Sequence, residues 1–526
     1  MKKLIANIFI FSLILSGMFL QSCTDLEEET RDKTTSDVLI EDPDLIPNLI
    51  APSLGKLREL CHREGWWGIQ EASSDELCFP TRGTDWFDGG VWQQQWLHNW
   101  TSQHRDVQNA WNVLNEGIAA ANFGISVLGE EEDVEEEILE YRATLKFLRS
   151  FFMYCLIDLY GISPYRDAFD LDYTKDPLIM DREQAFDFIV NDMRTIIDDM
   201  PEKAEADYGI PNRDAGLMLL AKMYINKEVY IGEAAYDSAL IYLNEIVGSG
   251  NYALADDYFG MFGPDNHENH LQPGDEGIFV IPFDDGDDYG MDDRTIWVQT
   301  TFHYNQTLMG AFNANWNGCM APQGYLEECW FAGTDTATDA RWVDSTIYPV
   351  MAVVNGFNYG QQHSLSGSNL QTRGGSPLIF TVECSLTNAS EAEGVRVLKY
   401  APRDVPVNVS RAPNDFLFWR YADVVLMKIE CDLREGTGNP LTEINELRTK
   451  RNAPTLSSVT LDDVLAERGR ELYWEGHRRQ DMIRFGTFLL PKTNKTSTSP
   501  ETAKLLPIPQ TALDAMPDLL DQNNGY

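Results

Sequence analysis

After its first twenty residues the sequence contains no further apolar run long enough to cross a bilayer. It is also poor in basic residues, with 41 Lys and Arg against 83 Asp and Glu and a formal net charge of −42. A chain this acidic repels phosphate backbones, so we do not expect nucleic acid as a partner. Several enzyme signatures are missing as well. There is no GxSxG, P-loop or GxGxxG motif, and His267–His270 lacks the HExxH spacing of zinc proteases.

The N-terminus, by contrast, has the parts of a bacterial export signal. Lys2 and Lys3 supply positive charge, and an apolar stretch over residues 4–20 follows. That stretch is too short, and too closely followed by polar residues, for a transmembrane helix. The next residues, LQSC, resemble a lipobox, in which the cysteine is acylated and becomes the first mature residue. We therefore predict that residues 1–22 are a lipoprotein signal peptide and that lipid on Cys23 is the only membrane attachment. An ordinary secretory signal with an incidental cysteine is the alternative.

An acidic tether follows over residues 23–45. It begins TDLEEE after Cys23 and resembles the surface-export signal of lipoproteins in the Bacteroidetes. A solvated linker would have the same composition. With the signal peptide, the tether predicts an outer-membrane location facing the cell exterior.

Seven cysteines remain after Cys23, and no two of them form a CxxC motif. An odd number leaves at least one cysteine unpaired in any intramolecular scheme. Cys155 and Cys431 lie in apolar helical runs and are predicted to be buried thiols. The pairings that the sequence leaves open are Cys61 with Cys78 and Cys319 with Cys329.

Apolar residues make up 43% of the chain, enough for a large core, and in residues 46–250 they recur at helical spacing. Val107, Trp111 and Leu114 illustrate the pattern. This part reads as successive helical hairpins similar to tetratricopeptide repeats, although the strict repeat consensus is absent. The predicted helices are His104–Leu128, Val134–Tyr160, Arg182–Met200, Arg213–Tyr230 and Tyr236–Ser249.

Residues 251–400 are instead rich in Gly, Asp, Asn and aromatic residues and have only short apolar runs. We predict an irregular insertion with short strands, and a long irregular segment inside a folded protein is usually functional. Helices return in residues 401–526. Because no Pro/Ser/Gly-rich linker divides the chain, residues 46–526 are expected to form one compact unit. The predicted C-terminal helices are Arg420–Arg434, Thr442–Lys450 and Leu461–Phe485.

Several separated stretches carry a family resemblance. They read KFLRSFFMYCLIDLYG at 146–161, WRYADVVL at 419–426, NELR at 445–448, LAERGRELYWEGHRRQDMIRFG at 465–486 and PIPQ…QNNGY at 507–526. Together with the lipobox they resemble the SusD/RagB family of Bacteroidetes outer-membrane nutrient-binding lipoproteins. The resemblance implies a mainly α fold of tetratricopeptide-like helix pairs with a loop-rich ligand-binding insertion. It also implies a binding protein without enzymatic activity, which captures glycans for a TonB-dependent outer-membrane transporter.

Carboxylates suggest two further sites, neither of which is the favoured interpretation; structural calcium at the second is kept as the alternative. Glu467, Glu471 and Glu475 share a face of the predicted closing helix, where paired carboxylates could perform acid–base catalysis. Three arginines in the same stretch favour a salt-bridge network instead, so we assign no catalytic residue. An acidic loop could hold calcium through hard oxygen ligands, but it lacks EF-hand spacing, and a solvated loop is favoured, so no metal or cofactor is predicted. Its carboxylates are Asp284, Asp285, Asp287, Asp288, Asp292 and Asp293.

Four tryptophans lie between residues 81 and 100. Trp92, Trp96 and Trp100 are spaced by four, so in one helix they would share a face, and we predict that they belong mainly to the core. The fourth, Trp86, lies in RGTDWFDGG, where three glycines favour an exposed turn. The apolar face of a sugar ring packs on indole, while its hydroxyl groups need polar partners. The candidate glycan-binding residues here are Trp86, Asp75, Arg82, Asp85 and Asp88.

A second candidate surface lies in the insertion. NANWNG at 313–318 places one tryptophan among amides and a glycine, and DYG at 288–290 adds a tyrosine. The starch-binding founder of the family is similar in having a Tyr-Gly loop and an Asn-Gly-Trp loop. Here the order is Trp-Asn-Gly, and the founder lacks TRGTDWFDGG, which puts starch itself in doubt as the ligand. The candidates are Tyr289, Asn315, Trp316 and Asn317, with Trp66 and Trp67 as weaker ones.

These observations predict a surface lipoprotein that binds an oligosaccharide and delivers it to a TonB-dependent transporter. The acidic net charge and the charge-poor aromatic sites favour a largely neutral glycan. A RagB-like lipoprotein that captures peptides is the alternative, and a glycosidase is the least favoured reading.

Overall fold

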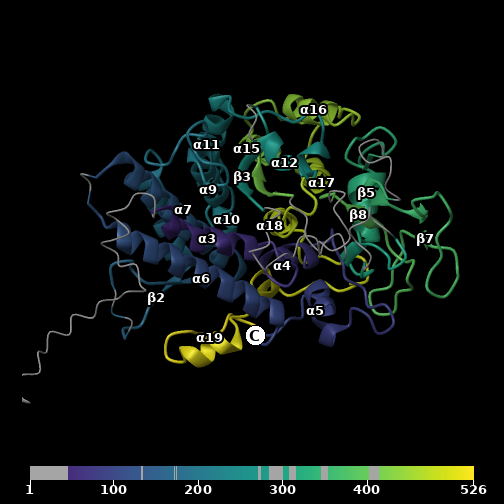
Figure 1. Ribbon diagram of the computed structural model, residues 1–526, viewed down its shortest axis with the longest axis horizontal. Coiled ribbons are helices and arrows are strands. Elements are labelled where there is room, and N and C mark those ends of the chain that lie inside the picture. Colours follow the sequence, from purple (N-terminus) through teal and green to yellow (C-terminus); the bar gives the residue numbers. More distant parts are fainter. Residues whose placement is uncertain are drawn as a thin grey trace, which may run out of the picture. The chain divides into compact units, whose positions relative to one another are not determined.

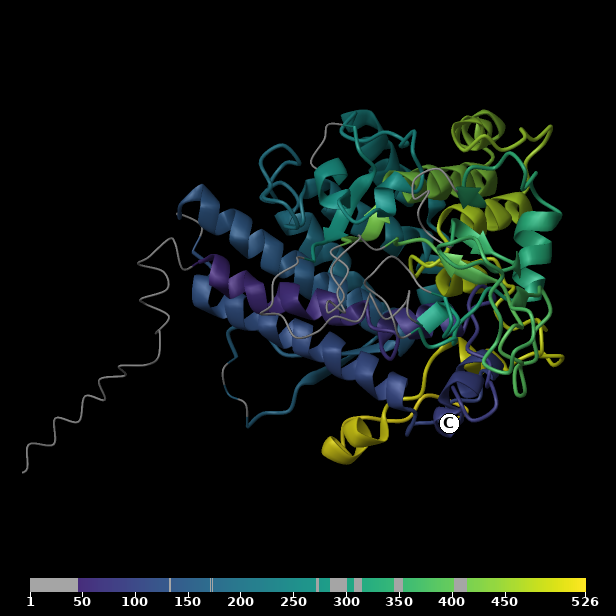
Figure 2. The ribbon, with the colours of Figure 1, turned by 45° about the vertical axis from the view of Figure 1, so that its right-hand side comes forward.

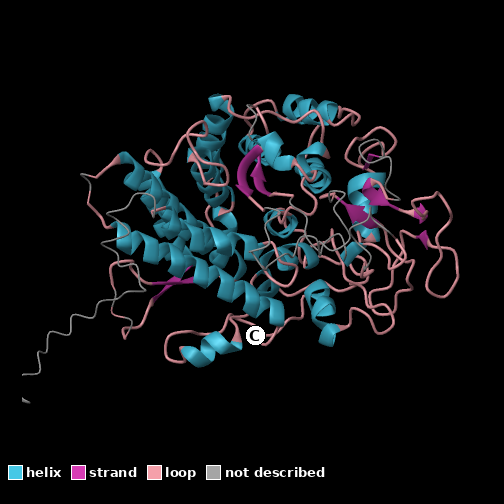
Figure 3. Cartoon of the chain, viewed as in Figure 1, coloured by secondary structure: helices cyan, strands magenta, loops and turns pink. Residues whose placement is uncertain are grey.

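The regular secondary structure of the computed structural model is mainly helical, with few strands, which confirms the predicted mainly α class (Figures 1 and 3). Residues 47–526 form one unit. The signal peptide, Cys23, the tether, Tyr289 and the acidic loop lie outside the described residues, so the structure does not test those predictions. The described residues are 46–131, 134–170, 172, 174–270, 274–283, 300–306, 315–344, 353–401 and 414–526.

The first half is built from packed helix pairs. Helix α3 (Pro47–Leu60) packs against both α6 (Arg105–Leu128) and α7 (Glu136–Leu159), and these two pack against each other (Figure 2). The next helix, α8 (Arg182–Ile196), packs on α7, and α9 (Arg213–Ile225) pairs with α11 (Tyr236–Ser249). This succession agrees with the helical hairpins that the periodicity predicts.

Helix α7 forms the centre of the core. Every residue from 142 to 159 is buried except Lys146. The rings of Phe147 and Phe151 meet Trp419 edge-on, with centroids 6.4 and 5.5 Å away. A helix that is apolar on all sides has to be covered on all sides, and α3, α6, α8 and the strand that carries Trp419 provide the cover.

Some predicted boundaries differ from the structure for local reasons. The predicted helix Arg213–Tyr230 is two helices, α9 and α10 (Lys227–Ile231), which meet at the buried Asn226. Helix α8 starts at Arg182 as predicted, where Asp181 forms a reciprocal capping box with Gln184, but it ends at Ile196 and not at Met200.

The insertion contains short strands, as predicted. Strands β3 (Gly277–Ile281) and β9 (Phe416–Arg420) pair antiparallel with two register shifts. The insertion also holds the three-stranded sheet of β4 (Val343–Asp344), β5 (Asn355–Asn358) and β8 (Arg396–Leu398), and the pair β6 (Gly360–Gln361) and β7 (Ile379–Phe380). In the N-terminal helical part, β1 (Ile162–Tyr165) pairs with β2 (Leu178–Asp181).

The C-terminal part returns to helices, and one prediction there is wrong. The predicted helix Leu461–Phe485 is interrupted between α17 (Leu461–Glu471) and α18 (Arg478–Arg484). Trp474 has φ of 62° and Gly476 has φ of 84°, and neither value continues an α-helix. The remaining helices are α4 (Trp66–Ala72), α5 (Val91–Leu97), α12 (Asn266–His270), α14 (Gln323–Tyr325), α15 (Tyr421–Glu435), α16 (Pro440–Lys450) and α19 (Gln510–Ala515).

Two buried carboxyl groups hold this interruption in place. Glu71 accepts a hydrogen bond from the Gly476 amide at 2.6 Å, and Glu76 accepts one from the Trp474 amide at 3.1 Å. A Cβ atom at position 476 would lie 2.7 Å from the ring of Trp66. Both the hydrogen bonds and the close approach favour a turn here over a continuous helix.

The described cysteines are buried. Cys155 and Cys431 are thiols, as predicted. Cys78, Cys319 and Cys329 are thiols too, so neither pairing that the sequence left open is formed. Among the helices of the described residues, none combines the length and the apolar composition needed to cross a bilayer.

Candidate functional site

Three of the four clustered tryptophans belong to the core. The side chains of Trp92, Trp96 and Trp100 are 1%, 1% and 3% exposed, which confirms the prediction of a structural role. Their indole N–H groups donate to Asp88, to the Thr493 carbonyl and to the Tyr526 hydroxyl. Trp100 lies beyond the end of α5, because His98 adopts a left-handed conformation that ends the helix.

The fourth tryptophan, Trp86, meets Trp316. Its Nε1 donates a hydrogen bond to the main-chain oxygen of Trp316 at 2.8 Å, and the ring centroids are 6.4 Å apart at 44°. Both side chains are partly exposed. The two candidate loops, which are 230 residues apart in the sequence, therefore form one surface, which we call the tryptophan platform.

Two backbone features bring the rings together. Trp86 has φ of 64°, a left-handed conformation that is strained for a bulky residue and that clusters at binding sites. Gly318 leaves the space that the indole occupies, since a Cβ atom there would lie 2.4 Å from Cε2 of Trp86. On the inner side the Trp86 ring lies 5.4 Å from Phe79 and 6.0 Å from Trp92. We expected a fully exposed Trp86, and this packing makes it half-buried instead.

A polar rim of four residues borders the platform. Asp85 accepts a hydrogen bond from the Tyr304 hydroxyl at 2.6 Å and forms an ion pair with Arg373 at 3.2 Å. Arg373 also pairs with Glu391 at 2.5 Å, and its guanidinium lies 3.9 Å above the Tyr304 ring. Burial would raise the pKa of Glu391, but hydrogen bonds from Arg373 outweigh it and lower that pKa. Arg373 is thus shared between two carboxylates and offsets the charge of only one of them. The four rim residues together carry a net charge of −1.

Sequence reasoning found Asp85 but missed Tyr304, Arg373 and Glu391. One local signal was available, because Arg373 precedes two glycines, as Arg82 precedes Gly83, and this composition favours exposed turns. Nothing in the sequence indicates that this turn folds back onto Asp85.

The other predicted site residues lie at different depths. Asp88 is exposed and accepts a hydrogen bond from Trp92 at 2.7 Å. Four predicted residues are buried, with exposed fractions of 8% for Asp75, 3% for Arg82, 2% for Asn315 and 0% for Asn317. Asp75 is paired with Arg478, and Arg82 donates to the Ser390 carbonyl. Asn315 donates to two carbonyls, and Asn317 accepts from Arg396.

These four residues lie beneath the surface, so they are not positioned for the direct contact with a glycan that the sequence predicts. Their hydrogen bonds and ion pairs instead hold the loops in place. The weaker candidates Trp66 and Trp67 are buried at 4% and 1% and belong to the core.

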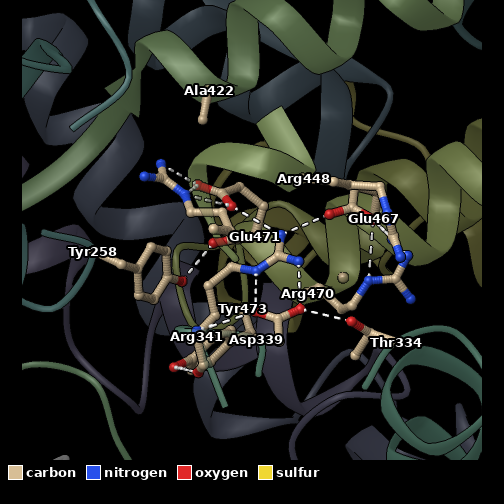
Figure 4. A network of polar contacts seen from close by, with 12 residues as sticks. Tyr258, Thr334, Asp339, Arg341, Ala422, Arg448, Glu467, Arg470, Glu471 and Tyr473 are labelled. Atoms are coloured by element: carbon tan, nitrogen blue, oxygen red, sulfur yellow. Dashed lines mark hydrogen bonds and ion pairs between the residues drawn. The ribbon is translucent and has the colours of Figure 1, made fainter. Parts of the chain in front are cut away.

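The carboxylates of the closing helix form the buried network that the sequence predicts (Figure 4). Glu471 forms ion pairs with Arg341, Arg420 and Arg451 at 2.8–3.0 Å. Glu467 forms ion pairs with Arg341, Arg448 and Arg470. Glu475 forms ion pairs with Lys399 and Arg420. We call this set the arginine–glutamate cluster. Its members are at most 2% exposed.

Charge in the cluster opposes acid–base chemistry. Burial raises the pKa of Glu471, but Arg451, Arg420 and Arg341 outweigh it and hold that pKa well below its ordinary value. The pKa of Glu475 is lowered in the same way by Arg420 and Lys399. A general acid at neutral pH needs a raised pKa and access to substrate, and these carboxylates have neither.

The fold and the platform define a class of protein: a helical scaffold that presents an aromatic surface from its loops. Comparison with known proteins agrees. A model described as "SusD family" matches residues 276–526, and one described as "Starch-binding associating with outer membrane" matches residues 74–225. The chain belongs to the SusD family.

Individual relatives are consistent with this assignment. The chain is 27% identical over 452 residues to the starch-binding protein SusD of Bacteroides thetaiotaomicron, covering 79% of this chain and 78% of that protein. A SusD superfamily protein from Parabacteroides distasonis superimposes with a TM-score of 0.73 at 17% identity, over 94% of this chain and 100% of that one. Surface glycan-binding protein A from Bacteroides thetaiotaomicron, solved with laminarihexaose, gives 0.63 at 20% identity, over 91% and 99%.

Proposed function

We propose that this protein binds a neutral oligosaccharide on the tryptophan platform. The observation that carries the proposal is the juxtaposition of Trp86 and Trp316, two partly exposed indoles from distant loops. The C–H face of a sugar ring packs on such indoles, and the rim residues Asp85, Tyr304 and Arg373 offer donors and acceptors to its hydroxyl groups. The relatives support this ligand class, because one is a starch-binding protein and another is a surface glycan-binding protein solved with laminarihexaose.

The charges favour a neutral ligand over an acidic one. The rim cation Arg373 already pairs with two carboxylates, Arg63 lies 5.2 Å above the Trp316 ring and pairs with Glu64 at 2.9 Å, and the whole chain carries −42. A uronic acid or sulfated chain would be repelled at long range and would find Arg373 and Arg63 already paired with carboxylates.

Calorimetry tests the proposal. Maltohexaose and laminarihexaose are titrated into the wild type, Trp316→Ala and Phe331→Ala, whose ring is 48% exposed and serves as the matched control. Stacking on an aromatic ring is worth about 1–3 kcal/mol, so Trp316→Ala should weaken binding roughly ten- to hundredfold. Phe331→Ala should bind like the wild type. Equal affinity in all three proteins would contradict the platform, and tighter binding of peptides than of glycans would favour the RagB-like alternative.

We further propose that the protein is not an enzyme and delivers its glycan to a TonB-dependent transporter from a lipid anchor on Cys23. The ion-paired carboxylates of the arginine–glutamate cluster support a binding role. The family description, which mentions association with the outer membrane, supports the location. Affinity purification of the tagged protein from detergent-solubilised outer membranes tests the partner, since a TonB-dependent transporter should be recovered with it.

A further inference from the structure

A cavity of about 570 Å³ lies at the end of the helical half, between the last turns of α6, the first half of α7 and the end of α8. This volume is within the range of small-molecule sites. The residues that matter to its chemistry are Ile125, Arg142, Lys146, Phe169, Ile196 and Asp199.

One wall of the cavity is apolar. The Phe169 ring, on the loop that follows β1, is 40% exposed, and Ile125 and Ile196 lie beside it in the lining. An exposed aromatic ring at the edge of a cavity provides the flat apolar surface on which the C–H face of a sugar packs.

The polar groups of the cavity have unused hydrogen-bonding capacity. Arg142 is 8% exposed, and its Nη atoms donate to the carbonyls of Leu128 and Glu131. Its buried Nε has no partner. Because that Nε is sealed from solvent, the groups that can meet a ligand are the side chains of Lys146, which is partly exposed, and Asp199, which is exposed.

The lining carries balanced charge. Arg142 and Lys146 face Glu130 and Asp199, two cations against two carboxylates. No ion pair to the described part of the chain occupies Lys146 or Asp199. A balanced set of donors and acceptors beside an aromatic ring suits a neutral polyhydroxylated ligand better than an ion.

The cavity is separate from the tryptophan platform. At the first turn of α6, Arg105 lies 5.2 Å above the ring of Trp92, which neighbours Trp86. Ile125 follows 20 residues later on the same helix, so about 30 Å separate the two places at 1.5 Å per residue.

We propose that this cavity, which we name the α6–α8 cavity, is a second binding site for a neutral saccharide. The inference rests on the proposed glycan-binding function. A long glycan that reaches both places would be held more tightly than either site alone holds it, because the second contact is intramolecular.

Methyl NMR gives a local readout. Protein labelled with ¹³C at isoleucine methyl groups is titrated with maltohexaose and with laminarihexaose, and the Ile125 and Ile196 signals are assigned from Ile125→Val and Ile196→Val spectra. We expect both signals to shift saturably with at least one of the two sugars. Loss of the stacking ring in Phe169→Ala should weaken this response about tenfold, and Lys146→Met should weaken it as well. Phe123→Ala, which removes an exposed α6 ring outside the cavity, should not.

The variants separate this inference from the platform. In Trp86→Ala the Ile125 and Ile196 shifts should persist with unchanged midpoints. Their loss in Trp86→Ala, their absence with both sugars, or an unchanged response in Phe169→Ala would each overturn the second site. If instead the isoleucine shifts persist while Trp316→Ala leaves total affinity unchanged, the platform proposal fails and the cavity stands.

Discussion

The indole N–H of Trp86 donates to the main-chain oxygen of Trp316 at 2.8 Å, and this bond joins two loops from opposite halves of the chain. Trp86→Phe keeps an aromatic ring but removes the donor. A hydrogen bond of this kind contributes about 0.5–1.5 kcal/mol. We therefore expect a lower melting temperature and a several-fold loss of glycan affinity, measured by scanning and titration calorimetry. Unchanged values in both would show that the bond does not position the platform.

Trp86→Ala should lower both stability and affinity, because its half-buried ring packs on Phe79 and Trp92. Truncation of a large buried aromatic side chain costs about 3–5 kcal/mol, and this half-buried ring should cost less. Chemical denaturation beside titration calorimetry checks both effects. A wild-type melting curve would contradict the packing described above.

Gly318→Ala tests the platform without touching an aromatic residue. The added Cβ atom would lie 2.4 Å from Trp86 Cε2, so the indole has to move, and such overpacking costs about 1–3 kcal/mol. Gly374→Ala is the control, because its Cβ atom would approach no other atom closer than 3.7 Å. Denaturation midpoints should fall for Gly318→Ala alone. Equal midpoints would mean that the loop relaxes freely.

The sequence indicates the two halves of the platform but not how they meet. Trp86 and Trp316 are recognisable because each lies among turn-forming residues. Buried Asp75 and Arg82 have the same local composition as the partly exposed Asp85, and only tertiary contacts distinguish them. The interruption at Trp474 and Gly476 is equally hidden, since LAERGRELYWEGHRRQDMIRFG has helical periodicity and the turn depends on Glu71 and Glu76, about 400 residues earlier.

Glu471→Gln should destabilise the protein without removing any catalysis. The change leaves Arg341, Arg420 and Arg451 with less negative charge in a fully buried site, and breaking a buried ion pair costs about 3–5 kcal/mol. Glu501→Gln, which affects the exposed pair with Lys504, is the control and should cost under about 1 kcal/mol. Denaturant titration measures both. Incubation of the wild type with polysaccharides should release no new reducing ends, and turnover lost in Glu471→Gln would refute the binding-only role.

Glu71 and Glu76 should contribute less to stability as the pH rises, whereas buried histidines such as His477, whose pKa burial lowers to about 4, contribute in the opposite direction. Burial raises the pKa of Glu71 to about 7 from its ordinary 4.5 and also raises the pKa of Glu76. The folded state keeps these protons where the unfolded state releases them, so the contribution of these two groups to the free energy of unfolding decreases between pH 4.5 and about 7. The slope is at most about 1.4 kcal/mol per pH unit for each group.

Glu71→Gln keeps an acceptor for the Gly476 amide but removes one titrating group. Urea midpoints measured across this pH range should therefore fall less steeply in the variant than in the wild type. Identical slopes would show that Glu71 holds no proton in the folded state.

Cys23→Ala should abolish acylation and leave the protein soluble in the periplasm, because the lipid on Cys23 is the only membrane attachment that we predict. Cell fractionation with metabolic labelling by a radioactive fatty acid measures this. The strain should also lack the transporter, so that indirect retention is excluded. A variant that still fractionates with the outer membrane in this strain would contradict the proposed anchor.

The arginine–glutamate cluster fixes both ends of one segment of the insertion. Arg341 and Lys399 lie at either end of a stretch that contains Arg373 and Glu391, and both bind carboxylates of the closing helix region. The entropy cost of closing a loop rises only slowly with its length once its ends are held. The same segment also holds the platform loops, because its Ser390 carbonyl accepts from Arg82 and its Arg396 donates to Asn317. A change inside the segment would therefore move the rim residues and the two tryptophans together, so the choice of sugar depends on the segment as a whole.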